Sequence, residues 1–418
     1  MILIKQAIVV CNSSSFNDKK VDLLVENGII SQIADTIPQT GYETQVIEVE
    51  GLHVSIGWID SGVSFGEPGF EERQTIKNGL DAAAVGGFTA VMLVPNNEPN
   101  PENATGIKSL LGIKGSHGVN LHPIGSLTNN QEGKHLAELH DMHQAGATSF
   151  YDFKTGLKDP NLLKIALQYS SSFNTTIQSF PEDKDLAGNG MINEDATTIH
   201  TGLKSKPIMA EVARVARDLT VLEYTGGRLH FPTISTAAAL DLIEKARDRD
   251  LNVSSSISVN HLILDSTALL EYDTNFKLQP PIRSHEQKES LLQLVKNGAG
   301  DMITSDHIAL NIELKAVEFD HADYGSVGLE TCFAALHAVL DIKDCVRLLT
   351  GAYDKFNIDQ PSIAVGTTAN LTLFTSSPAG VVEQSMYTST SRNAALVGAG
   401  SKGTVVGIIN NNKCVLNE

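Results

Sequence analysis

Both ends of the chain alternate apolar and polar positions in the short runs that are typical of β-strands. Residues 2–10 and 21–34 are rich in β-branched side chains, and the Asn27-Gly28 pair inside the second run is typical of a tight hairpin turn. Residues 369–377 and 403–418 repeat this pattern, with Gly and Asn between short apolar stretches. Two β-rich ends around a different middle predict a single β-sandwich assembled from both termini.

The middle of the chain, roughly residues 57 to 355, changes to a pattern in which helices and strands take turns. An amphipathic helix at 72–87 runs into a buried strand at 88–95, and the same order recurs at 164–180, 237–258 and 288–306. This alternation is typical of a parallel sheet covered by helices. About eight such units fit an α/β fold of the closed (β/α)8 type, whose site lies at the C-terminal ends of the strands.

The domain organisation follows from these two patterns. We expect a (β/α)8 barrel domain of the TIM type, and a small β-sandwich domain built from both termini. The predicted boundaries are 54–357 for the barrel, with 1–53 and 358–418 for the composite sandwich.

Composition narrows the classes of partner. Lys plus Arg number 31 and Asp plus Glu 49, so the net charge of −18 argues against a nucleic-acid or anionic-membrane surface. No run approaches the roughly 18 apolar residues of a membrane helix, and the start lacks the basic flank of a secretory signal. The four cysteines form no CxxC pair. We therefore expect a cytoplasmic protein with reduced thiols and no Cys-based zinc site.

Several segments of the chain resemble the dihydroorotase branch of the amidohydrolase superfamily in their order and spacing. The first, 57–99, reads GWIDSGVSFGEPGFEERQTIKNGLDAAAVGGFTAVMLVPNNEP and is similar to the family's first barrel strand, first helix and second strand. The others are 182–194, 208–231, 275–284, 301–309, 325–331, 365–374 and 391–411. The resemblance covers nearly the whole chain and implies the same barrel and sandwich.

The resemblance also implies a metal site. Working members of the family bind one or two zinc ions through a His-x-His pair after the first strand, an acidic or carboxylated residue after the fourth, single histidines after the fifth and sixth, and an aspartate after the eighth. Zinc takes imidazole nitrogen and carboxylate oxygen, and it lowers the pKa of a bound water to about 7 so that the water can attack an amide.

This chain departs from that ligand set at every histidine. Gly62-Val63-Ser64 stands at the His-x-His pair, and Phe180 and Thr233 stand at the single histidines. Gly has no side chain, Phe no lone pair and Thr only a neutral hydroxyl. We therefore predict that the chain binds no metal.

Two acidic residues keep family positions. Asp306, in the SDH motif, matches the aspartate that serves as the catalytic base, but without partners that activate a target it is predicted to be non-functional or structural. Asp152 matches an acidic residue near the fourth strand, although Phe153 follows it.

The substrate side of the family's site is altered too. The arginine that grips the substrate carboxylate is replaced by Gly66, and a histidine by Leu310, so the strongest anchor for that anion is lost. Asn96 matches a family asparagine and is a candidate ligand-binding residue, although an Asn after a strand and a proline commonly only shapes a turn.

The remaining histidines favour structural roles. His135, His140 and His143 include an i,i+3 pair on a predicted helix, where a solvated helix face is favoured over a metal site. His230 and His261 are predicted to be hydrogen-bonded core or rim histidines.

Two functions stay open. Dihydroorotase-like chains that lack the ligands are found with aspartate carbamoyltransferase, and resemblance to them implies an inactive structural or regulatory partner, in a homo-oligomer or hetero-oligomer. The alternative is an active dihydroorotase or another cyclic amidohydrolase with one metal at Asp306, helped by Asp60, Asp152 or His307. A small-molecule sensor that reuses the emptied barrel mouth is a third possibility, but the sequence indicates no ligand for it.

Overall fold

A computed structural model describes residues 1–39, 44–113 and 117–417, and its larger part is the barrel. Within these residues eight parallel strands follow one another around it: β6 (Trp58–Val63), β7 (Phe88–Leu93), β8 (Asn120–Pro123), β9 (Ser149–Phe150), β10 (Thr176–Gln178), β13 (Leu229–Phe231), β14 (Val253–Ser258) and β15 (Met302–Thr304). Parallel bridges from Gly125 to Phe150 and from Ser64 to Ile308 close the ring. The predicted (β/α)8 barrel is confirmed.

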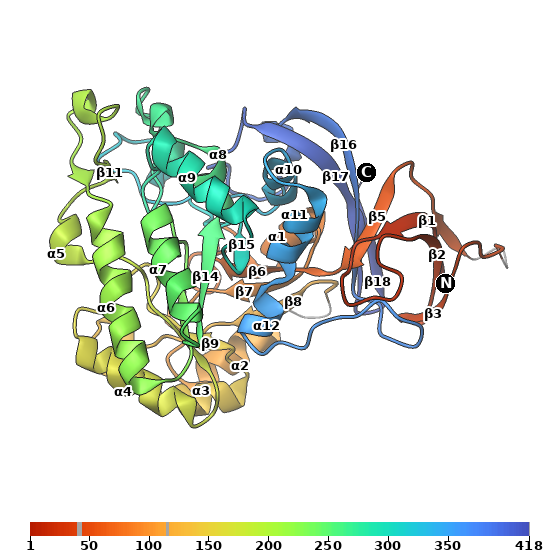
Figure 1. Cartoon of the computed structure of the whole chain (residues 1–418), viewed down its shortest axis with the longest axis horizontal. Helices are drawn as coiled ribbons and strands as arrows, with labels where there is room; N and C mark the ends of the chain where they lie inside the picture. Colours follow the sequence, from red (N-terminus) through yellow and green to blue (C-terminus); the bar gives the residue numbers. More distant parts are fainter. Residues whose placement is uncertain (40–43, 114–116, 418) are drawn as a thin grey trace.

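Helices cover the outside of this barrel (Figure 1). They are α1 (Ile76–Val85), α2 (Ala104–Ile113), α3 (Leu139–Ala145), α4 (Pro160–Ser171), α5 (Lys184–Ala187), α6 (Met209–Thr225), α7 (Ala237–Arg247), α8 (Val259–Ile263), α9 (His285–Lys296), α10 (Cys332–His337), α11 (Ile342–Thr350) and α12 (Ala352–Lys355). Helix α1 shows how the sequence determines where a helix begins and ends. The Thr75 hydroxyl caps α1 by accepting from the Asn78 N–H at 3.2 Å, and Gly86 and Gly87 end the helix before β7.

Long loops at the C-terminal side of the strands carry short elements of their own. These are β11 (Ile192–Asn193) and β12 (Ser205–Lys206), together with the 3-10 turns η1 (Asn129–Gln131), η2 (Ile199–Thr201), η3 (Ser266–Leu269), η4 (Thr274–Phe276) and η5 (Ile312–Leu314). A sixth turn, η6 (Gln384–Met386), lies between the last long strands.

The two ends of the chain meet in one eight-stranded sheet, drawn at the right of Figure 1. Its strands are β1 (Ile2–Val9), β2 (Lys20–Glu26), β3 (Ile29–Ala34), β4 (Gln45–Ile47), β5 (Leu52–Ile56), β16 (Leu371–Val381), β17 (Gly400–Asn410) and β18 (Lys413–Leu416). The order is β18-β17-β16-β5-β1-β2-β3, with β4 beside β1, so β16 joins the C-terminal strands to β5. Asn27 and Gly28 form the turn between β2 and β3 with φ of 49° and 77°. The predicted β-rich domain from both termini is confirmed.

The sheet and the barrel share a packed junction. On β17, Val405 and Ile408 belong to the core of the barrel, whereas Val406 and Ile409 pack in the core of the sheet. Val405 and Ile408 are three residues apart and share a side because the register of β16 with β17 shifts between them. The ring of Trp58, on the first barrel strand, lies 5.2 Å from that of Phe374 on β16 and 4.8 Å from that of Phe333 on α10. The barrel core therefore includes side chains from the C-terminal sheet.

The helices and the cysteines of the described residues bear on the expectations about membranes and disulfides. Among them, no helix combines the length and the apolar character needed to cross a bilayer. All four cysteines are free thiols: Cys11, Cys332 and Cys345 are buried and Cys414 is half-buried.

Candidate functional site

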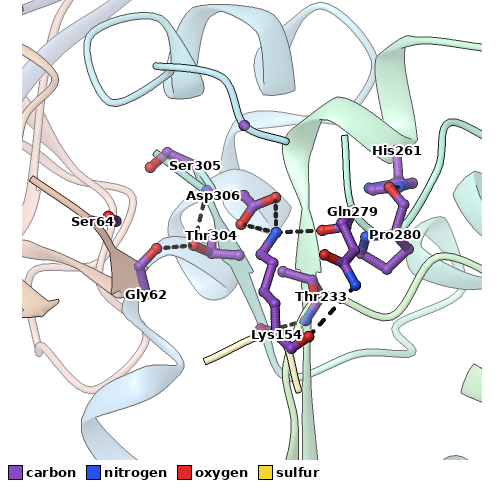
Figure 2. A network of polar contacts seen from close by, with 12 residues as sticks. Gly62, Ser64, Lys154, Thr233, His261, Gln279, Pro280, Thr304, Ser305 and Asp306 are labelled. Atoms are coloured by element: carbon purple, nitrogen blue, oxygen red, sulfur yellow. Dashed lines mark hydrogen bonds and ion pairs between the residues drawn. The ribbon is translucent and has the colours of Figure 1, made fainter. Parts of the chain in front are cut away.

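The candidate site lies at the barrel mouth, where the strands end, and an ion pair occupies its centre (Figure 2). Asp306 follows β15 and is 5% exposed. Its two carboxylate oxygens lie 2.8 and 2.9 Å from the Nζ atom of Lys154, which follows β9. The same ammonium group donates to the backbone carbonyl of Gln279. A lysine therefore contacts Asp306, the carboxylate that matches the catalytic base of the family.

Sequence reasoning missed Lys154. Lys154 and Asp306 are 152 residues apart, and only closure of the barrel brings their side chains together. A weak signal was present, because Lys154 stands just beyond the end of a buried strand, where a barrel places its site.

The four positions that lost histidines carry groups that are poor metal ligands. The carbonyl of Gly62 accepts from Thr304 Oγ1 at 3.3 Å, and the Ser64 hydroxyl accepts from Asn96 Nδ2 at 2.7 Å. The Phe180 ring is buried in the apolar interior of the barrel. Thr233 has a left-handed backbone, with φ of 52°, and its buried hydroxyl has no hydrogen-bond partner among the described residues.

The neighbouring carboxylates, Asp60 and Asp152, accept hydrogen bonds mainly from backbone N–H groups. Asp60 accepts from Thr304 Oγ1 at 2.6 Å and from the Ser305 N–H at 2.7 Å. Asp152 accepts from the N–H groups of Leu127 and Thr128 at 3.0 and 2.9 Å. Burial raises the pKa of both carboxyl groups, as it does for Asp306, where Lys154 opposes the effect. These contacts indicate that Asp60 and Asp152 hold the loops at the strand ends.

Three buried histidines near the mouth are held neutral. His307 contacts Gln74 Oε1 through Nε2 at 2.8 Å, His230 lies between the hydroxyls of Ser254 and Ser256, and His261 Nε2 lies 3.1 Å from the Pro280 carbonyl. Burial lowers the pKa of each imidazole to about 3. The expectation of hydrogen-bonded core or rim histidines agrees with these contacts.

The other histidine group lies on the barrel wall. His140 and His143 are on α3, and His135 is exposed in the loop before it. His143 is half-buried and its Nδ1 lies 2.9 Å from Thr175 Oγ1, so only part of this predicted solvated face is in water.

The position of the lost arginine is closed to any side chain. Gly66 has φ of 115°, and a Cβ atom there would lie 2.5 Å from the carbonyl oxygen of Phe70. Leu310, at the position of the lost histidine, is buried. Asn96 is half-buried and bonded to Ser64, while its own Oδ1 has no partner among the described residues. The backbone around Gly66 therefore leaves no room for an arginine side chain at this position.

The residues present do not fit the zinc that the family uses. Within residues 1–39, 44–113 and 117–417, no group of three or more His, Cys, Asp and Glu side chains is placed to hold a metal ion. Zinc sites in enzymes take three protein ligands and keep one position open. Here the remaining carboxylate already faces an ammonium group, which would repel a second cation.

Solved structures with the same architecture define the class of protein. The L-hydantoinase (dihydropyrimidinase) of Arthrobacter aurescens matches with a TM-score of 0.87 at 20% identity, over 100% of this chain and 96% of that one. The D-hydantoinase (dihydropyrimidinase) of a Thermus species matches with a TM-score of 0.84 at 20% identity, over 100% and 95%. At this identity the likeness shows the fold, a TIM-type barrel with a β-sandwich domain.

Sequence comparison then narrows this class to one family. A family model described as "Dihydro-orotase-like" matches residues 52–239. A dihydroorotase of Syntrophus aciditrophicus (strain SB) is 33% identical over 396 residues, 93% of each chain. One of Pelotomaculum thermopropionicum is 33% identical over 419 residues, 97% of each chain. This chain belongs to the dihydroorotase family.

Proposed function

We propose that this protein is a metal-free, catalytically inactive member of the dihydroorotase family that acts in pyrimidine biosynthesis as a structural or regulatory partner of aspartate carbamoyltransferase. One observation carries the loss of activity. The retained aspartate, Asp306, has a lysine ammonium against both carboxylate oxygens, and Gly62, Ser64, Phe180 and Thr233 offer no imidazole around it.

The chemistry of amide hydrolysis explains why this arrangement is inactive. At neutral pH the attacking water must be activated, which the family achieves with bound zinc. An ammonium group supplies no open coordination position for a water. Asp306 also cannot serve freely as a base, because its proton-accepting oxygens are engaged by Lys154.

The substrate side supports the same conclusion. A bidentate guanidinium is the strongest side-chain anchor for a carboxylate, and Gly66 has no space for one. Catalysis and recognition are therefore lost together, whereas an enzyme adapted to another metal would keep its grip on the substrate.

The partner role rests on what the chain retains. The relatives are matched over nearly their full length, so the fold is kept although the histidines of the metal site are lost. Two large apolar side chains are mostly exposed, Tyr224 at the end of α6 (79%) and Ile199 in η2 (73%). The partner itself is implied by the resemblance to dihydroorotase-like chains that lack the ligands and are found with aspartate carbamoyltransferase.

The test combines metal analysis, a ring-opening assay and copurification. We expect the purified protein to contain no stoichiometric zinc and to hydrolyse no dihydroorotate, with a dihydroorotase relative as positive control. We expect it to coelute with the catalytic chain of aspartate carbamoyltransferase, whose assembly falters without it. Stoichiometric zinc together with turnover that Asp306→Ala abolishes would overturn the loss of activity, and failure to coelute would overturn the partnership.

A further inference from the structure

We propose that the Lys154 ammonium is a tethered replacement for the metal cation of the barrel mouth: it neutralises Asp306 and holds the strand ends in place without a bound ion. This inference rests on the proposed loss of the metal and adds the reason why the mouth stays folded after that loss.

The contacts of the ammonium group resemble the oxygen shell of a bound cation. A lysine ammonium has three donors and no acceptor. Two of its contacts are with the Asp306 oxygens, at 2.8 and 2.9 Å, and the third is with the Gln279 carbonyl. All three donors are therefore matched by oxygen atoms, and the side chain of Lys154 is only 8% exposed.

The backbone at both ends of the pair directs these side chains towards each other (Figure 2). Lys154 and Asp306 both have left-handed backbone conformations, with φ of 48° and 50°. Residues other than Gly rarely adopt this conformation. The Lys154 N–H donates to the Tyr151 hydroxyl at 2.9 Å, and the Asp306 N–H donates to Thr304 Oγ1 at 3.0 Å. Strained residues persist where their surroundings determine them, which indicates that this pairing is built into the site.

Charge accounting supports the same role. Among the described residues, Lys154 is the only cationic side chain in contact with Asp306. Lys206, a further buried lysine, forms its own ion pair with Glu182. Removing Lys154 would therefore leave a buried carboxylate with no compensating charge, which is strongly unfavourable.

The first test is a double-mutant cycle read by thermal unfolding of the full chain. Lys154→Met is expected to lower the unfolding midpoint by about 3–6 °C, and adding Asp306→Asn should recover most of that loss. The matched control is Lys158→Met, four residues after Lys154 in the chain. It removes an exposed ion pair with Asp185 and should shift the midpoint by less than about 1 °C. The inference would be overturned if Lys154→Met left the unfolding midpoint unchanged, or if the double variant recovered none of the loss.

The second test asks whether the position of Nζ is a cation position. Lys154→Glu places a second carboxylate beside Asp306, so the variant should be destabilised and Mn²⁺ or Zn²⁺ should raise its midpoint. Neither the parent nor Lys158→Glu should respond. A Lys154→Glu chain that folds but is unaffected by these ions would overturn the inference, and if it does not fold, the cycle above decides. Zinc in the parent protein would instead contradict the proposed function, so the two failures are distinguishable.

Discussion

At the scale of single residues, His230 shows how burial can make the protein sensitive to acid. Its imidazole is fully buried on β13, between two serine hydroxyls and the ring of Phe356, 5.0 Å away between centroids. Burial lowers the pKa of His230 to about 3. The folded protein therefore excludes a proton that the unfolded chain takes up below about pH 6.5.

This imbalance predicts a stability difference that grows in acid. Between about pH 6.5 and pH 3 the unfolded state binds more protons at His230, so the contribution of this residue to the free energy of unfolding falls as the pH falls. His230→Asn removes that contribution. When the pH is lowered from 7 to 5, the free energy of unfolding of the variant should therefore fall by about 2 kcal/mol less than that of the parent. Urea unfolding of both chains at the two pH values measures this. A difference that does not change with pH would contradict it.

The sequence predicted part of the site at this scale. Gly62, Phe180 and Thr233 could be assigned because each replaces a residue at a fixed place in a motif. The structure brings Gly62 and Thr233 to the barrel mouth and buries Phe180 in the apolar interior of the barrel. Lys154 could not be assigned, because its meaning depends on the position of Asp306 across the closed barrel. The backbone conformation of Gly66 was not predicted either, although the contact that requires a glycine is local. It comes from the turn in which the Phe70 N–H donates to the Gly66 carbonyl, and no motif considered in the sequence marks that turn.

At the scale of elements, one carboxylate fastens three segments together. Glu211, in the first turn of α6, accepts from the Thr236 N–H and hydroxyl at 2.8 and 2.7 Å, just before α7. Arg283, just before α9, contacts Glu211 at 3.4 Å, the Ser235 hydroxyl at 2.9 Å and Asn193 on β11 at 3.0 Å. The loop after β10 is thereby tied to two neighbouring strand ends.

This network predicts a large stability loss on a nearly isosteric change. Glu211→Gln removes the ion-pair partner of the buried Arg283 cation, so the free energy of unfolding should fall by about 3–5 kcal/mol. The double variant Glu211→Gln with Arg283→Met should lose less than the sum of the single changes. Denaturant unfolding of the four chains provides the cycle, and strictly additive losses would contradict this coupling.

Periodicity predicted the helices and strands of the barrel well, and the loops poorly. The segment 237–250 reads as a helix and α7 spans Ala237–Arg247, because its apolar side chains recur with helical spacing. The segment around β11 and β12 has no such pattern. Its course is set by tertiary contacts such as Lys206 with Glu182 and Arg283 with Asn193, which local sequence does not reveal.

At the scale of the whole molecule, the two predicted domains share side chains across their junction. Val405 and Ile408 of β17 and Phe374 of β16 belong to the barrel core, although they lie in the C-terminal segment. We expect a fragment of residues 54–357 alone to expose this apolar surface and to lack fixed tertiary packing. Its amide NMR spectrum should be poorly dispersed, whereas that of the full chain should be well dispersed. A well-dispersed spectrum of the fragment would contradict this prediction.

The single tryptophan of the chain sits in that junction. Trp58 is fully buried, and its indole N–H donates to the Ser55 hydroxyl at 2.9 Å, while its ring faces Phe374 from the far end of the sequence. The tryptophan fluorescence of the protein therefore has one source, placed where sheet and barrel meet. A red shift of its emission would report separation of the two bodies by the entry of water, with no label added.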